Sequence, residues 1–364
     1  MKNLLHIDSS GNRIFGLDLM RFIAIITVLI SHSITVLPAR FHKVHNFIFD
    51  GVLIFFVLSG FLIGRIFIRD FQNECNTVKI VYFWKRRWFR TLPAYYFTVI
   101  LLFCLSYFAG RQVDISDLFK SFLFIQNIYY HSGHFFPESW SLAIEEWFYL
   151  LLPILFLIFQ KFLKKNTRVS ILFVFIFISL VSVVIRIFVF IRTDVSSIAE
   201  WDQNFRSPVI TRLDSILMGV LGAWFYIFKI DYFKKYKNIF FIIGVSIFFF
   251  NKLYLDYYIE SFNNFYMCVW YFSIVPASIF LMIPKFYYMK PSRFHTLNTV
   301  IVKGSLISYS MYLINLSIIS FIVLHNLRIN YWWKFSLFWV LTIIGSILMY
   351  KYIEIPLMKL RDKS

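Results

Sequence analysis

His32 and Arg21 have side chains suited to catalysis, yet both lie within one apolar run, residues 15–37. Ionisable residues inside an apolar segment of this length are rare and usually functional. Eleven residues at about 100° each return to within roughly 20° of the same side of a helix, with a rise of about 16 Å. The two side chains therefore share one face at two depths. Histidine, with an ordinary pKa of about 6.5, suits general-base catalysis near neutral pH.

Two carboxylates open a second apolar run. Glu145 and Glu146 follow its start in residues 139–160. If this run enters from the side at which the first run ends, the carboxylates reach about the level of His32. Glu145 could then orient the imidazole or stabilise its protonated form. For Glu146, the favoured interpretation is a structural role, in which it orients a neighbour or hydrates the helix end.

A third apolar run, residues 207–228, carries Arg212 and Asp214 at a similar depth. Three separate helices would thus bring charged groups to one level, which favours a polar site. The alternative is a buried structural ion pair between Arg212 and Asp214. For Arg186 and Lys252, which also lie within apolar runs, lining or snorkelling is the favoured interpretation.

A basic cluster precedes the third apolar run. The stretch "WKRRWFRTLP" contains Arg86, Arg87 and Arg90. Arginine binds phosphate through two parallel hydrogen bonds and keeps its charge, so the cluster could hold a phosphorylated ligand. The alternative is an ordinary basic loop that contacts lipid headgroups.

Membrane-spanning helices must position all these residues. A span needs roughly 20 mostly apolar residues. The sequence predicts an all-α polytopic membrane protein, a bundle of about ten transmembrane helices, at 15–37, 47–68, 91–109, 139–160, 169–191, 207–228, 239–258, 264–284, 304–326 and 333–351.

Composition supports this fold class. Hydrophobic residues make up 59% of the chain and charged residues only 15%, whereas about 25% charged residues is typical of soluble domains. Of the 37 Lys and Arg, 24 fall in alternate loops together with the termini and 8 in the opposite loops. This asymmetry predicts that both termini, and Cys75, are cytoplasmic. It also accounts for the net charge of +18 without nucleic acid.

The three cysteines, Cys75, Cys104 and Cys268, lack metal-ligand spacing and are odd in number, so we expect neither a metal centre nor a disulfide framework. The first apolar run lacks a cleavage site and is expected to remain as a span. We expect residues 1–364 to form a single membrane domain without an appended soluble domain.

Six motifs occur in a consistent order along the chain. They are Arg21 with His32, "FFVLSGFLIG", the pair Arg87 and Arg90, "WSLAIEEWFYL", "RLDSILMG" and "YIEIPL". In these motifs the sequence resembles the acyltransferase-3 family of integral membrane acyltransferases. The resemblance extends over nearly the whole chain, and the order of the motifs makes it specific.

The resemblance implies transfer of an acyl group, commonly acetyl from acetyl-CoA, across the membrane to a hydroxyl group. Acceptors in the family are mostly sugars of surface polysaccharides and lipopolysaccharides. We therefore expect a multi-pass protein of the bacterial inner membrane that contacts membrane lipid and a glycan acceptor. The expected cofactor is acetyl-CoA as acyl donor, with no metal.

The expected site follows from combining the motifs with the chemistry. His32 acts as general base or as a covalent acyl carrier, Arg21 holds the thioester or stabilises an oxyanion, and Glu145 supports the imidazole. Arg86, Arg87 and Arg90 bind the phosphates of CoA. The residues expected to bind the acceptor are Trp140, Glu146, Arg212, Asp214 and Asn315.

One position departs from the family pattern. The ninth span usually reads Tyr-Leu-Ile-His, but here Asn315 ends the sequence "YLIN". An amide forms hydrogen bonds but takes up no proton near neutral pH. More of the acid–base work is therefore left to His32.

Two other functions fit parts of the sequence. A transporter or flippase for a lipid-linked sugar would also need buried charges, but such folds often contain paired repeats with broken helices, and no such pairing is visible. A structural partner in a polysaccharide assembly complex is the third alternative.

Overall fold

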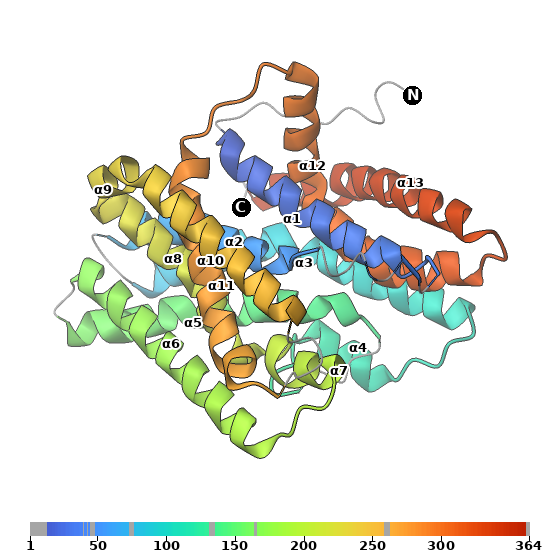
Figure 1. Cartoon of the computed structure of the whole chain (residues 1–364), viewed down its shortest axis with the longest axis horizontal. Coiled ribbons are helices and arrows are strands. Elements are labelled where there is room, and N and C mark those ends of the chain that lie inside the picture. The colour runs from blue at the N-terminus through green and yellow to red at the C-terminus, as the bar shows by residue number, and fades with distance from the viewer. Residues whose placement is uncertain are drawn as a thin grey trace.

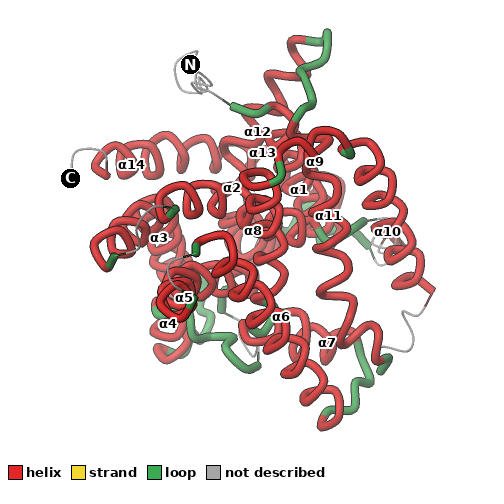
Figure 2. The backbone as a smooth tube through the Cα atoms, turned by 90° about the vertical axis from the view of Figure 1, so that its left-hand side faces the viewer, coloured by secondary structure: helices red, strands yellow, loops and turns green. Residues whose placement is uncertain are grey.

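The computed structural model describes residues 13–38, 40–41, 43, 48–72, 76–130, 135–163, 166–257 and 263–361. All regular structure within these ranges is helical (Figure 2), as the sequence predicts. The helices form one bundle, with α6 along its lower left edge in Figure 1 and α13 at the upper right.

The long helices have the following bounds: α1 Phe15–Ile34, α2 Gly51–Phe71, α3 Thr77–Phe108, α5 Trp140–Phe162, α6 Thr167–Arg192, α8 Leu213–Phe228, α10 Lys237–Tyr257, α11 Tyr271–Tyr287, α12 His295–Ile314 and α13 Tyr331–Met349. The short helices are α4 Ile115–Phe122, α7 Ile198–Trp201, α9 Ile230–Lys235 and α14 Ile355–Arg361. Wider π-helical turns at Asp202–Arg206, Tyr266–Trp270, Asn315–Leu324 and Tyr350–Glu354, and 3₁₀ turns at Pro137–Ser139 and Val209–Thr211, adjoin them.

Nine of the described helices are long and apolar enough to cross a membrane. Among the ten predicted spans, 207–228 is the exception, because its helix α8 begins only at Leu213 and has 16 residues. At 1.5 Å per residue this helix covers about 24 Å, less than the roughly 30 Å of a hydrocarbon core. Pro208 and the following 3₁₀ turn keep the preceding residues out of the α-helix.

Helices α2 and α8 form the centre of the bundle, where two glycines allow their backbones to meet. A Cβ atom on Gly60 would lie 1.9 Å from the carbonyl oxygen of Ile216, and one on Gly219 would lie 2.0 Å from that of Val57. Any side chain at either position would force the helices apart. This close packing fixes α2, from which several residues of the site described below extend.

Two local features set the ends of the elements near the site. Asp50 caps α2, because its carboxylate accepts a hydrogen bond of 2.9 Å from the backbone N–H of Val52. At the other side, α12 ends at Ile314 and continues from Asn315 as a π-helical segment. Wider turns of this kind shift the phase of the helix and occur often at functional sites.

The orientation of the bundle in a membrane stays a prediction. Cys75, which the charge pattern assigns to the cytoplasm, lies outside the described residues.

Candidate active site

Two cavities lie within the bundle. The first, of about 410 Å³, is lined by residues that include His32, Asp50, Glu138, Trp140 and Arg206, and we call it the histidine cavity. The second, of about 450 Å³, is lined by residues that include Arg13, Arg21, Arg86, Arg87, Arg90 and Glu145, and we call it the arginine cavity. The two linings share Val52 and Tyr312, so these side chains separate the cavities.

His32 lies in the last turn of α1 and contacts the start of the π-helical segment. Its Nδ1 is 2.5 Å from Oδ1 of Asn315. The Nδ2 group of Asn315 donates to the backbone carbonyls of Met311 and Tyr312, each at 2.8 Å. Asn315 is fully buried. The amide that ends the motif "YLIN" is therefore bound directly to His32.

Glu138, and not Glu145, is the buried carboxylate of the histidine cavity. The Ser317 hydroxyl donates to its Oε2 at 2.5 Å, and the Ser317 N–H donates to its Oε1 at 3.0 Å. Glu138 was not among the expected site residues because it lies before the predicted span. The pair Pro137–Glu138 directly ahead of an apolar run was the available signal.

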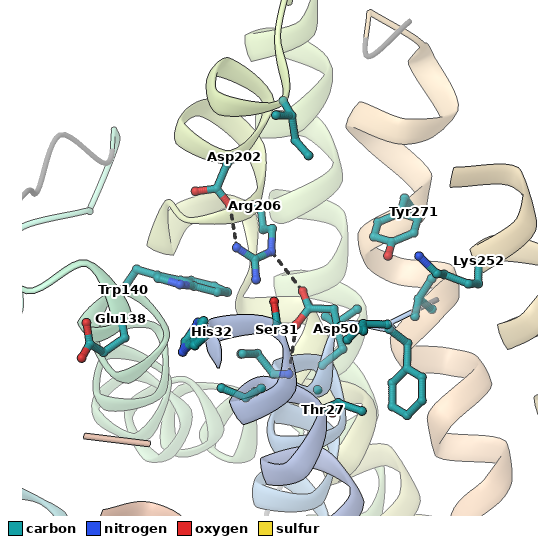
Figure 3. A pocket seen from close by; sticks show the side chains of 18 of the residues that line it. Thr27, Ser31, His32, Asp50, Glu138, Trp140, Asp202, Arg206, Lys252 and Tyr271 are labelled. Carbon is teal, nitrogen blue, oxygen red and sulfur yellow. Dashed lines mark hydrogen bonds and ion pairs between the residues drawn. The ribbon is translucent and has the colours of Figure 1, made fainter. Parts of the chain in front are cut away.

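Arg206 closes another side of the histidine cavity. It donates to Asp50 at 3.0 Å and to Asp202 at 2.6 Å, and its guanidinium lies 4.6 Å from the ring centre of Trp140 (Figure 3). Burial by itself lowers the pKa of Arg206, but the charges of Asp50 and Asp202 outweigh it and raise the pKa. Burial likewise raises the pKa of Asp50, which precedes α2, but the charge and hydrogen bond of Arg206 lower it overall. The charges of Arg206 and Asp50 therefore stabilise each other.

Lys252 and Tyr271 face the histidine cavity from α10 and α11, across from His32 (Figure 3). Aromatic and charged side chains therefore surround a space that is open to a polar ligand. Hydroxyl-rich ligands can use such donors and acceptors, with aromatic faces against their apolar sides.

The arginine cavity gathers residues from helices far apart in sequence. Arg21 extends from α1 and Glu145 from α5. The Arg87 guanidinium lies 4.2 Å from the ring centre of Tyr149, whose hydroxyl donates to Glu145 at 3.0 Å. Five arginines line this cavity against three carboxylates, those of Asp70, Glu145 and Glu354. The excess of positive charge suits the cavity to an anion.

Glu145 was expected beside His32, and that expectation was wrong. Residue 138 already reaches the histidine cavity, and seven further residues correspond to about 10 Å of helix rise. Glu145 therefore lines the cavity that contains Arg21. Its neighbour Glu146 accepts a hydrogen bond of 2.8 Å from the Thr91 hydroxyl and lines neither cavity.

The ion pair between Arg212 and Asp214, which was the alternative to a role in acceptor binding, does not form. Asp214 instead binds Arg186, and both are fully buried. Arg212 lies 4.2 Å from the ring centre of Phe272, and none of its side-chain nitrogens has a hydrogen-bond partner among the described residues. Neither Arg212 nor Asp214 lines the two cavities.

Asp18 of α1 has two partners among the described residues. Its carboxylate binds the guanidinium of Arg13, with an Nε–Oδ2 distance of 2.8 Å, and accepts from the Ser305 hydroxyl at 2.8 Å. Arg21 therefore remains available to the arginine cavity. Within the described ranges, no group of three His, Cys, Asp or Glu side chains could hold a metal ion.

The fold is that of a polytopic helical membrane protein, with one cavity lined by His32 and another rich in arginine inside one bundle. The family described as "Acyltransferase domain" matches residues 14–351, and the chain belongs to this family. The resemblance seen in the sequence motifs is thereby confirmed.

Curated relatives carry the name O-acetyltransferase. The chain is 28% identical over 374 residues to O-acetyltransferase OatA of Staphylococcus aureus strain NCTC 8325 / PS 47, and equally to OatA of strain COL. Each alignment covers 94% of this chain and 57% of the relative, so the chain spans little more than half the length of these relatives. No solved structure matches the chain.

Proposed function

We propose that this chain is a membrane O-acetyltransferase that moves an acetyl group from acetyl-CoA to a hydroxyl of a sugar or glycan. The observation that carries the proposal is the pair of adjacent cavities, whose linings share Val52 and Tyr312. A donor in one cavity and an acceptor in the other would meet at this boundary. The names of the curated relatives support the same chemistry.

The donor occupies the arginine cavity. Its phosphates bind Arg86, Arg87 and Arg90, which lie in the basic first half of α3, because guanidinium groups pair with phosphate oxygens through two hydrogen bonds. Arg21 lies further along the cavity and holds the thioester end, where it stabilises negative charge on the carbonyl oxygen.

The acceptor occupies the histidine cavity, with Trp140 and the Asp50–Arg206–Asp202 cluster at its walls. His32 removes the proton from the acceptor hydroxyl as the oxygen attacks the thioester carbonyl carbon. The carbon–sulfur bond breaks, the ester forms, and the proton leaves with the CoA thiol. In the covalent alternative, His32 itself takes the acetyl group first and then passes it to the hydroxyl.

The arginine cavity faces the cytoplasm in this proposal, with both termini on that side of a bacterial inner membrane. The charge asymmetry of the loops supports this orientation. The region matched by the family, residues 14–351, acts as one membrane acyltransferase unit.

The test uses purified protein with radiolabelled acetyl-CoA and surface glycan isolated from cells that lack this chain. We expect release of free CoA that depends on the glycan, together with base-labile label on the glycan. Mass spectrometry of glycan from cells with and without the chain should show the same acetyl ester. If the glycan gains no label and CoA release does not depend on it, the proposal is wrong.

A further inference from the structure

We infer that Asn315 is a positioning residue that holds His32 in one tautomer, with the proton on Nδ1 and the basic lone pair on Nε2. The inference rests on the proposed function for its catalytic meaning, but its geometry stands independently. It changes the role expected from the sequence, in which Asn315 was assigned to the acceptor.

The first step is the orientation of the Asn315 amide. One end of the amide lies 2.8 Å from two backbone carbonyl oxygens, those of Met311 and Tyr312. A carbonyl oxygen offers only lone pairs, so the end that faces two of them must be the NH₂ group. The opposite orientation would place three oxygens together in a fully buried site. The orientation of Asn315 is therefore fixed by its own helix.

The second step follows from that orientation. The end of the amide that faces Nδ1 of His32 is Oδ1, at 2.5 Å. Oδ1 can only accept a hydrogen bond, so Nδ1 must donate it and must carry a proton. In a neutral imidazole with one proton, the lone pair then lies on Nε2.

The third step concerns the reaction. When Nε2 takes up a proton from the acceptor hydroxyl, Nδ1 keeps its proton and its bond to Asn315. The same contact therefore serves both protonation states, and the ring need not turn during turnover. A histidine at position 315 could either donate or accept a hydrogen bond. The Oδ1 atom of Asn315 faces His32 and can only accept one. The asparagine in "YLIN" is thus suited to holding a single base.

The position of Asn315 depends on the backbone. It is the first residue of the π-helical segment Asn315–Leu324, directly after Ile314 ends α12. The fully buried side chain spans from its own helix to the last turn of α1. This contact joins the two elements at the histidine cavity.

Other charged and titratable groups surround the same cavity and will contribute to its pH dependence. They come from six further elements or their ends: Asp50, Glu138, Asp202 with Arg206, Lys252, Tyr271 and Tyr312. Substitution of Asn315 leaves all of them in place, so a comparison of variants isolates its effect.

The direct test is nitrogen NMR of protein labelled with ¹⁵N-histidine in micelles. The signals of His32 are identified as those lost in His32→Gln. We expect a protonated Nδ1 and an unprotonated Nε2 when His32 is neutral, and loss of this preference in Asn315→Leu. A protonated Nε2 in the wild-type protein would overturn the inference.

Kinetics provide a second test that a purely structural role would not satisfy. Asn315→Leu should lower kcat by about 10²-fold, a loss typical of impaired base catalysis, while KM for acetyl-CoA stays the same. Asn315→Asp keeps the acceptor and adds a negative charge, which favours the imidazolium. The apparent pKa on the acid side of the pH–rate profile of this variant should therefore rise by about one unit or more.

The matched control is Asn326→Leu. Asn326 is exposed, and its Nδ2 also donates to the backbone carbonyl four residues earlier, that of Ile322. The activity and pH profile of Asn326→Leu should equal those of the wild type. If the acid-side apparent pKa of Asn315→Asp equals that of the wild type, the result counts against the inference. If NMR confirms the tautomer but His32→Ala still transfers acetyl at the wild-type rate, the proposed catalytic role of His32 fails and the tautomer assignment remains.

Discussion

Arg186 of α6 and Asp214 of α8 form a bidentate ion pair, with Nη2–Oδ2 and Nη1–Oδ1 distances of 2.8 and 3.1 Å. Both side chains are fully buried. The Ser273 hydroxyl donates to Asp214 at 2.6 Å, so α11 joins the same network. This pair links three helices and explains why charge is tolerated at this place in the bundle.

Removing one partner of this pair should destabilise the protein strongly. Asp214→Asn leaves the Arg186 charge buried without a counter-charge, which typically costs about 3–5 kcal/mol. The free energy of unfolding, measured by denaturant titration in mixed micelles, should fall by this amount. The control is Asp117→Asn, which removes an exposed pair with Lys120 and should cost about 0–1 kcal/mol. Equal effects of the two variants would contradict a structural role for the buried pair.

His32 should be essential for transfer but not for donor binding. Loss of a general base typically costs about 10²–10⁴-fold in rate, so His32→Ala should abolish measurable acetyl transfer. His32→Gln keeps a hydrogen bond without basicity and should fail as well. Acetyl-CoA binding by both variants should match the wild type. His325→Ala, a change at an exposed histidine, is the control, and near wild-type transfer by His32→Ala would move the site elsewhere.

The arginine cavity should determine affinity for the donor. The double variant Arg87→Ala with Arg90→Ala should weaken binding of acetyl-CoA at least about tenfold, because charge-assisted contacts to phosphate are lost. Lysine at both positions should restore binding only in part, since it lacks the fork geometry. Equilibrium binding of labelled acetyl-CoA is the measurement, with the exposed Arg192→Ala as control. Unchanged affinity would limit these arginines to membrane anchoring.

Tyr312 should set the length of acyl group that can pass. Its ring lines both cavities, and its hydroxyl donates to the Glu138 carbonyl at 2.8 Å. Tyr312→Ala should enlarge the passage and raise the rate with butyryl-CoA relative to acetyl-CoA. Tyr312→Phe keeps the ring and is the matched control, with an unchanged preference. If Tyr312→Ala shows the same preference as the wild type, the acyl group takes another route.

Cys75 tests the orientation. Since the loop charges predict a cytoplasmic position, a membrane-impermeant thiol reagent should label Cys75 in lysed cells and spare it in intact cells. Cys104 and Cys268, both within predicted spans, are replaced by serine so that a single thiol remains. Labelling of intact cells would reverse the assignment of donor and acceptor sides.

The sequence by itself determined the fold class and the sites of most membrane helices, because long apolar runs must cross a membrane as helices whatever their neighbours. It also identified Arg21 and His32, since a charge within such a run requires an explanation. Helix periodicity then placed the two residues on one face at different depths, in agreement with their positions in two cavities.

Pairings between helices were decided only by the tertiary structure. Arg212 and Asp214 are two residues apart and so do not face each other on a helix, and Asp214 meets Arg186 from α6 instead. The depth of Glu145 depended on where α5 begins. The seven residues between Glu138 and Glu145 are enough to place the two carboxylates in different cavities. Asn315 reaches His32 through a contact between α1 and a π-helical segment 283 residues further along the chain. Such contacts depend on helix rotation and packing, which local sequence does not specify.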